Sequence, residues 1–108
     1  MVYEAFLRFL GLGARAGKLA YGSAATDSAI KTGKARLVVV DGSASDSTKK
    51  SFVDACSYYG TRIIVLPEGE NLAKYIGKGN KVTGIICPEF AENAIKKYDM
   101  CTGGEVIE

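Results

Sequence analysis

The stretch GKLAYGSAATDSAIKTGKARLVVV, residues 17–40, decides the fold because it combines an extended segment, a helix and a buried strand. We expect Lys18 to Tyr21 to be extended and Ser23 to be the N-cap of the helix, since its hydroxyl can accept an otherwise unpaired backbone N–H. Gly33 is expected to end that helix. Leu37 to Val40 is an unbroken apolar run, which is typical of a central strand buried on both faces. This alternation predicts an α/β domain.

The same alternation continues through the rest of the chain. Short turns separate predicted helices over about 2–12, 23–32, 46–59, 71–76 and 88–98 from predicted strands over 18–21, 37–40, 63–66 and 82–87. The strand over 63–66 is expected to be buried. Helices on both faces of one small sheet make a three-layer α-β-α sandwich. We therefore expect a single domain over residues 1–98 and a flexible tail over residues 99–108.

The third predicted helix contains two tyrosines with different expected roles. Ser45 or Asp46 can cap this helix, and Phe52 and Tyr59 fall on its apolar side. Tyr58 and Tyr59 could both stack on nucleic-acid bases. Because Tyr59 lies on the apolar stripe, we expect its ring to belong to the core.

Gly11, Gly13 and Ala16 match the GxGxxA pattern of dinucleotide-binding loops. Such a loop requires a strand before it and a helix after it, whereas a predicted helix precedes this one. We expect Gly11, Gly13 and Gly17 to break the first helix, to let the chain turn and to allow a close approach of the backbone to a neighbouring group, of which RNA is one candidate. A small enzyme or nucleotide-binding domain that uses this turn is the weakest alternative.

Composition excludes several classes of protein. The chain has 108 residues, close to the commonest domain size, and its apolar runs fall far short of the ~20 residues of a membrane helix. Its N-terminal segment lacks the pattern of a secretory signal, so we expect a cytoplasmic protein. There is no histidine, and Cys56, Cys87 and Cys101 form no CxxC pair, which argues against zinc sites, disulfides and hydrolytic triads. The sequence predicts no metal, no cofactor and no catalysis.

The net charge of +2 is unevenly distributed along the chain. Residues 1–50 contain eight basic and four acidic side chains, whereas residues 51–108 contain six basic and eight acidic ones. A surplus of cations suits a surface that faces phosphates, because cationic side chains release the counterions condensed on nucleic acid. A solvated basic face accounts for the same distribution equally well.

The helix start at Gly22 and Ser23 is the strongest candidate for a binding site. The first N–H groups of a helix point outward, and the helix dipole makes that end positive. Lys18 precedes this start and Lys31 and Lys34 follow it, so a phosphate backbone would have several cationic partners. From these residues alone, a capped helix with solvated lysines is the slightly simpler interpretation.

Four segments of the chain occur in a characteristic order. They are Gly17-Lys18-Leu19 followed by Gly22, the segment 34–40 (KARLVVV), the segment 41–50 (DGSASDSTKK) and the segment 71–78 (NLAKYIGK). In this order and spacing they resemble the ribosomal kink-turn-binding family, the proteins like ribosomal protein L7Ae. The sequence is most similar to the short bacterial branch usually called YlxQ, and the resemblance extends from about Leu10 to Tyr98.

The resemblance implies a mixed four-stranded sheet between helices, and binding to RNA in which a duplex kinks beside tandem sheared G·A pairs. In that family the start of the second helix enters the RNA groove, and an apolar loop after the last strand contacts bases flipped out of the bulge. The corresponding RNA-binding residues here are Lys18, Gly22, Ser23, Ala24, Ala25, Ser28, Lys31 and Lys34, together with the loop Ile85, Ile86, Cys87 and Pro88. We expect a monomer that recognises structured RNA by its shape and is associated with the ribosome or translation.

The chain departs from this family at the residues that read bases. Kink-turn binders usually carry Asn-Glu at the two positions after Gly-Xaa and a lysine four residues beyond the Asn, whereas here those positions hold Ala24, Ala25 and Ser28. Alanine cannot hydrogen-bond to purine edges, and each lost contact costs about 1–3 kcal/mol in base discrimination. We expect RNA binding that is weaker or differently targeted. A protein–protein interaction module that has lost kink-turn specificity is the main alternative.

Overall fold

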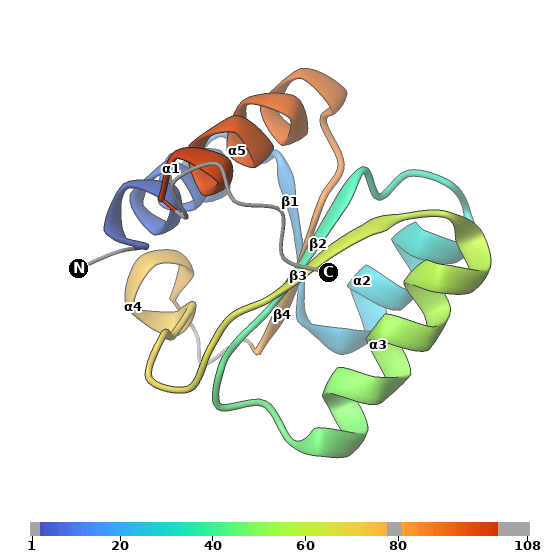
Figure 1. Cartoon of the computed structure of the whole chain (residues 1–108). Helices are drawn as coiled ribbons and strands as arrows, with labels where there is room; N and C mark the ends of the chain where they lie inside the picture. The colour runs from blue at the N-terminus through green and yellow to red at the C-terminus, as the bar shows by residue number, and fades with distance from the viewer. Residues whose placement is uncertain (1–2, 78–80, 102–108) are drawn as a thin grey trace.

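The computed structural model describes residues 3–77 and 81–101, which form an α/β domain (Figure 1). In chain order the elements are α1 (Glu4–Arg15), β1 (Leu19–Tyr21), α2 (Gly22–Lys31), β2 (Leu37–Val40), α3 (Asp46–Tyr59), β3 (Arg62–Val65), α4 (Ala73–Ile76), β4 (Val82–Ile85) and α5 (Pro88–Cys101). The predicted alternation of helices and strands is confirmed.

The strands form one mixed sheet in the order β1-β4-β2-β3. β4 is antiparallel to both of its neighbours, whereas β2 and β3 are parallel and are joined by the crossover helix α3. The predicted fold class, a three-layer α-β-α sandwich with a small mixed four-stranded sheet, is therefore confirmed.

Helices cover both faces of this sheet. In Figure 1, α2 and α3 lie on one side of the strands, and α1, α4 and α5 lie on the other. Alternate residues of β2 face the two cores: Leu37 and Val39 pack with the α1, α4 and α5 side, and Val38 and Val40 pack with the α2 and α3 side. All four side chains are fully buried. This double burial is the physical reason for the unbroken apolar run in the sequence.

The first helix does not break where its glycines begin. α1 continues through Gly11 and Gly13 to Arg15, and it is Gly17, with a φ of +71°, that turns the chain. A Cβ on Gly11 would lie 3.1 Å from the Tyr75 carbonyl oxygen, and a Cβ on Gly13 would lie 2.5 Å from the Phe90 ring. These two glycines therefore allow α4 and α5 to approach α1, and they do not form a nucleotide-binding loop.

Two expectations about burial are wrong, whereas one about capping is confirmed. The strand predicted over 63–66 is buried only in part: Ile64 and Leu66 are buried, whereas Val65 is 37% exposed because β3 lies at the edge of the sheet. Tyr59 is 46% exposed, because the last turn of α3 borders the C-terminal end of α2 instead of the core. As predicted, Ser45 is the N-cap of α3, and its side chain accepts a hydrogen bond from the Thr48 N–H.

The C-terminal helix extends beyond its predicted end. α5 includes residues 99–101, which were expected to begin the tail, and residues 102–108 of that tail lie outside the described residues. Within the described part of the chain, no helix combines the length and the apolar character needed to cross a membrane.

Candidate nucleic-acid interface

The candidate interface begins at the N-terminal tip of α2, whose first turn is Gly22 to Ala25. Tyr21 is still extended, and Gly22 turns the chain into the helix with a φ of +83°, a conformation that residues with a Cβ rarely adopt. The prediction that Ser23 is the N-cap is wrong, because the helix starts one residue earlier and Ser23 lies within its first turn. Ser23, Ala24 and Ala25 are all exposed.

The amides of this tip carry an unbalanced positive charge. Among the described residues, no side chain caps the start of α2, and its first turn contains no acidic residue. The first N–H groups of a helix have no carbonyl partner within the helix, and the dipole adds roughly half an elementary charge there. The tip is thus able to donate hydrogen bonds to an anionic group of another molecule.

The start of β4 lies beside the tip of α2. Tyr21 is the register partner of Thr83, and the Thr83 hydroxyl donates a 2.7 Å hydrogen bond to the Ala20 carbonyl oxygen. Lys81, the residue before β4, is exposed. This register places the positive charge of Lys81 at the same end of the sheet as the amides of Gly22 and its neighbours.

The carboxylate of Asp41 ties the loops at this end together. Asp41 follows β2 and is 1% exposed. One carboxylate oxygen accepts hydrogen bonds from the Ser43 N–H and hydroxyl, and the other accepts one from the Leu72 N–H, all at 2.7 Å. Burial by itself raises the pKa of Asp41, but the Ser43 and Leu72 hydrogen bonds and the charge of Lys81 together lower it below its usual value. The ionised carboxylate therefore holds the start of α4 against the end of β2.

Gly42 permits a close backbone contact in the same region. A Cβ on Gly42 would lie 2.0 Å from the Pro67 carbonyl oxygen. The Gly42 N–H donates to the Glu70 carbonyl oxygen at 3.0 Å, and the Gly42 carbonyl oxygen accepts a 3.0 Å hydrogen bond from the Lys49 ammonium. The loops after β2 and β3 are thus held rigidly next to each other.

Lys18 and Lys34 lie at the opposite end of the sheet from the α2 tip. The Lys18 carbonyl oxygen accepts a 3.0 Å hydrogen bond from the Ile86 N–H, at the end of β4, and Lys34 follows the C-terminal end of α2. α2 has ten residues, which corresponds to about 15 Å. The structure therefore does not bring these two lysines together with Gly22 and Ser23.

The predicted apolar loop after the last strand also lies at this far end. Ile85 is fully buried between its register partners Leu19 and Leu37, so it cannot contact a bound molecule. Ile86 is 38% exposed, Cys87 is half-buried and Pro88 is exposed as the first residue of α5. The loop and the tip of α2 form no common surface, because β4 is antiparallel to β1.

A family model described as the ribosomal protein L7Ae/L30e/S12e/Gadd45 family matches residues 5–97. The chain belongs to this family. A curated relative, the RNA-binding protein YlxQ of Enterococcus faecium, is 38% identical over 86 residues, which cover 80% of this chain and 84% of the relative. This match agrees with the resemblance seen in the sequence.

Two solved structures have a fold similar to that of this chain. A Bacillus halodurans protein of unknown function superimposes with a TM-score of 0.78 at 30% identity, over 87% of this chain and 96% of that one. The 15.5 kD RNA-binding protein of Giardia lamblia superimposes with a TM-score of 0.73 at 17% identity, over 93% of this chain and 89% of that one. At that low identity the second likeness concerns the fold alone.

The remaining predicted site residues lie along α2 of this L7Ae-family member. Ser28 is exposed one helical turn after Ala24, so both residues share a face of the helix. Lys31 lies in the last turn and forms a 2.9 Å ion pair with Asp27. The hydrogen bond and charge of Asp27 raise the pKa of Lys31. Ser28 therefore extends the surface of the tip, whereas Lys31 belongs to the opposite end of α2.

Lys81 and Asp41 were not identified from the sequence as parts of this region. The Asp-Gly-Ser turn after a buried strand was visible, but its contact with Leu72, 31 residues later, depends on the tertiary fold. That Lys81 lies at the same end of the sheet as the α2 tip depends on the register between β1 and β4, and its ammonium donates a hydrogen bond to the Ser43 hydroxyl oxygen. The only feature of the sequence that could have indicated Lys81 was its place directly before a predicted strand.

Proposed function

We propose that this chain is an RNA-binding protein and that it contacts RNA with the tip of α2. The observation that carries this proposal is the first turn at Gly22 to Ala25, which is exposed from Ser23 onward and has neither a side-chain cap nor an acidic residue among the described residues. Family membership and the RNA-binding name of the Enterococcus faecium relative support the proposal.

The proposed contact relies on the backbone. The amides of the tip donate hydrogen bonds to phosphate oxygens or base edges. Lys81, at the same end of the sheet and hydrogen-bonded to the Ser43 hydroxyl, pairs with a phosphate. Because Ala24 and Ala25 have short side chains, the RNA can approach the helix closely, but they offer no hydrogen bonds to bases. Recognition by shape, as in a kinked duplex whose groove is opened, is the mode that fits this surface.

Lys18, Lys34 and the loop of Ile86 have a smaller role in this proposal. They lie at the far end of the sheet, so an RNA held at the α2 tip reaches them only if it wraps around the domain. Lys18 and Lys34 still attract RNA over a distance of about one Debye length. The protein binds without catalysis, and the ribosomal name of its family makes ribosomal RNA the first natural RNA to examine.

The test compares affinity for a kink-turn RNA with affinity for a straight duplex of equal length, each over a series of salt concentrations. We expect tighter binding to the kinked RNA at every salt concentration. Equal affinities with equal salt slopes would mean that charge alone attracts RNA, and that shape recognition is absent. No binding to either RNA would contradict the proposal and favour a protein–protein interaction module.

A further inference from the structure

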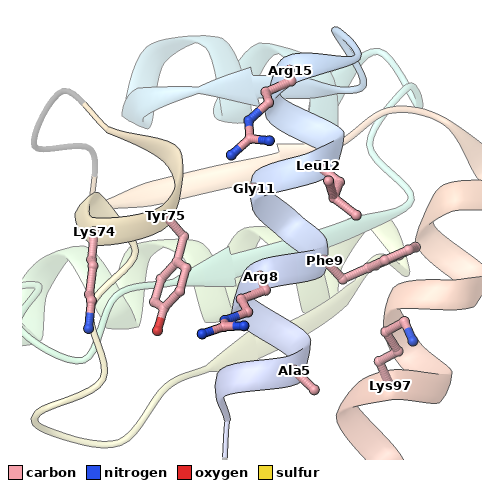
Figure 2. A pocket seen from close by; sticks show the side chains of 9 residues that line it. All are labelled: Ala5, Arg8, Phe9, Gly11, Leu12, Arg15, Lys74, Tyr75 and Lys97. Carbon is pink, nitrogen blue, oxygen red and sulfur yellow. The ribbon is translucent and has the colours of Figure 1, made fainter.

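A groove of about 610 Å³ runs along the outer face of α1, between α4 and α5. Figure 2 shows the groove with α1 at its centre. The side chains that enter it on the α4 side are Arg8, Arg15 and Tyr75, and those on the α5 side are Phe9, Leu12 and Lys97. This surface covers the face of the sheet opposite to α2, so it is separate from the helix tip described above.

The groove is strongly positive. Its lining contains the cations Arg8, Arg15, Lys74 and Lys97 and no carboxylate, as far as the described residues extend. Glu4 forms an ion pair with Arg8, at the edge of the groove. The other three cations have no described carboxylate within ion-pair distance. Uncompensated cations over a low-dielectric wall attract a polyanion.

The floor of the groove is apolar. Leu12 is 54% exposed, and the rings of Phe9 and Tyr75 are half-buried. Phe9 is held in place by stacking on Phe90, with ring centroids 4.3 Å apart, and the Lys97 ammonium lies 5.3 Å from the Phe9 centroid. A rigid apolar floor bordered by cations suits a ligand that has both negative charges and exposed apolar surface.

α4 connects this groove with the α2 tip. Lys74 and Tyr75 of α4 form one wall of the groove. The Leu72 N–H, directly before α4, is hydrogen-bonded to the Asp41 carboxylate at the end of β2. That end of the sheet also holds the start of α2, so the loop that leads into α4 and the α2 tip lie at the same end of the sheet.

We infer that this groove binds the backbone of an unpaired RNA strand that flanks the element held at the α2 tip. The inference rests on the proposed function. The phosphates contact Arg15, Lys74 and Lys97, the three cations without a described carboxylate partner, and the bases or riboses lie on Leu12 and the edges of the Phe9 and Tyr75 rings. A duplex presents only its sugar-phosphate backbone here, so the apolar floor favours a single strand. An acidic protein segment would also be attracted by the cations of the groove, but unlike a flanking RNA strand it would not be joined to an RNA element held at the α2 tip.

The experiment uses a kink-turn RNA with and without a tail of about eight unpaired uridines, and the uridine oligomer alone. The groove variant is Lys74→Ala with Lys97→Ala, which keeps helix-forming residues at both positions. Its matched control is Lys50→Ala with Lys96→Ala, which removes the same charge from exposed helical positions outside the groove. Thermal unfolding of both variants checks that each one folds.

We expect the tail to tighten binding, and the groove variant to lose about tenfold of affinity for tailed RNA and for the oligomer at low salt. Affinity for the untailed RNA should not change, and the control should behave like the original protein. The inference is wrong if the tail adds nothing, or if its gain survives in the groove variant.

Two further outcomes separate this inference from the proposed function. If the kink-turn RNA is not bound but the oligomer is bound through the groove, the proposed function fails and the groove remains an RNA site. If a polyglutamate peptide binds in a groove-dependent manner while the oligomer does not, the groove is a protein-docking surface and the inference is overturned.

Discussion

Replacing Ala24 by aspartate puts a carboxylate into the first turn of α2, where the structure has no acidic residue. Ala24 is exposed, so the new side chain does not disturb the core. An acid in the first turn of a helix interacts favourably with the dipole, and such an interaction is worth about 0.3–1 kcal/mol. We therefore expect the free energy of unfolding of Ala24→Asp to be unchanged or slightly raised.

RNA binding should change in the opposite direction. A phosphate about 6 Å from the new carboxylate is repelled by about 0.7 kcal/mol in bulk water and by about 3 kcal/mol at an effective dielectric constant of 20. These energies correspond to an affinity loss between about threefold and about a hundredfold. The loss should shrink at high salt, because the charges at the tip are exposed to screening ions.

The assay is fluorescence anisotropy with a labelled kink-turn RNA at low and high salt, combined with urea unfolding of the same protein. Ser57→Asp on α3 is the control, since it adds the same charge at an exposed position away from the tip. Unchanged RNA affinity in a folded Ala24→Asp variant, or an equal loss in the control, would refute the reasoning that the tip meets a phosphate.

Three further variants have defined expectations. Asp41→Asn should lower the free energy of unfolding by about 1–3 kcal/mol, because hydrogen bonds to a buried carboxylate are lost. The pKa of Asp41 is lowered in the fold, so its contribution to the free energy of unfolding is fully present above the unfolded pKa of about 3.9 and is lost as the pH falls through the folded pKa. The free energy of unfolding should therefore fall less steeply with decreasing pH in the variant than in the original protein. Identical pH dependences would contradict this. Gly42→Ala should cost several kcal/mol, at least about 3, in urea unfolding, since its Cβ would lie 2.0 Å from the Pro67 carbonyl oxygen; a cost below about 1 kcal/mol would show that the loops can separate. Ala24→Asn with Ala25→Glu should raise the preference for kinked over straight RNA about tenfold or more, because base-edge hydrogen bonds become available; an unchanged ratio in anisotropy titrations would argue against base contact at these positions.

The local elements of this fold were predictable because they depend on short-range physics. The apolar run of β2 identified a strand buried on both faces, and Ser45 identified the start of α3 through a hydrogen bond that spans only three residues. Gly33, with left-handed backbone, ends α2 as expected, and the left-handed Gly60 directly follows the last residue of the helix predicted over 46–59. Such signals are complete within one turn or one strand.

The predictions for Gly11 and Gly13 were wrong because the residues that contact them are distant in the chain. Gly11 and Gly13 were interpreted as helix breakers, whereas they are contact points for Tyr75 and Phe90. Helix propensity alone disfavours glycine, and the compensating close approach of another helix is not visible locally. The prediction that Ser23 is the N-cap of α2 was wrong for a local reason, because the helix begins one residue earlier, at Gly22.

The sequence by itself determined the order of strands and helices along the chain, the central buried strand, the exposed start of α2 and the family to which the chain belongs. Only the tertiary structure decided which charged residues share a surface. The antiparallel register of β1 and β4 places Lys81 at the end of the sheet that holds the α2 tip and Ile86 at the far end, and the packing of α4 and α5 on α1 creates the basic groove. Strand register and helix packing depend on side chains far apart in the chain, so no local pattern of residues specifies them.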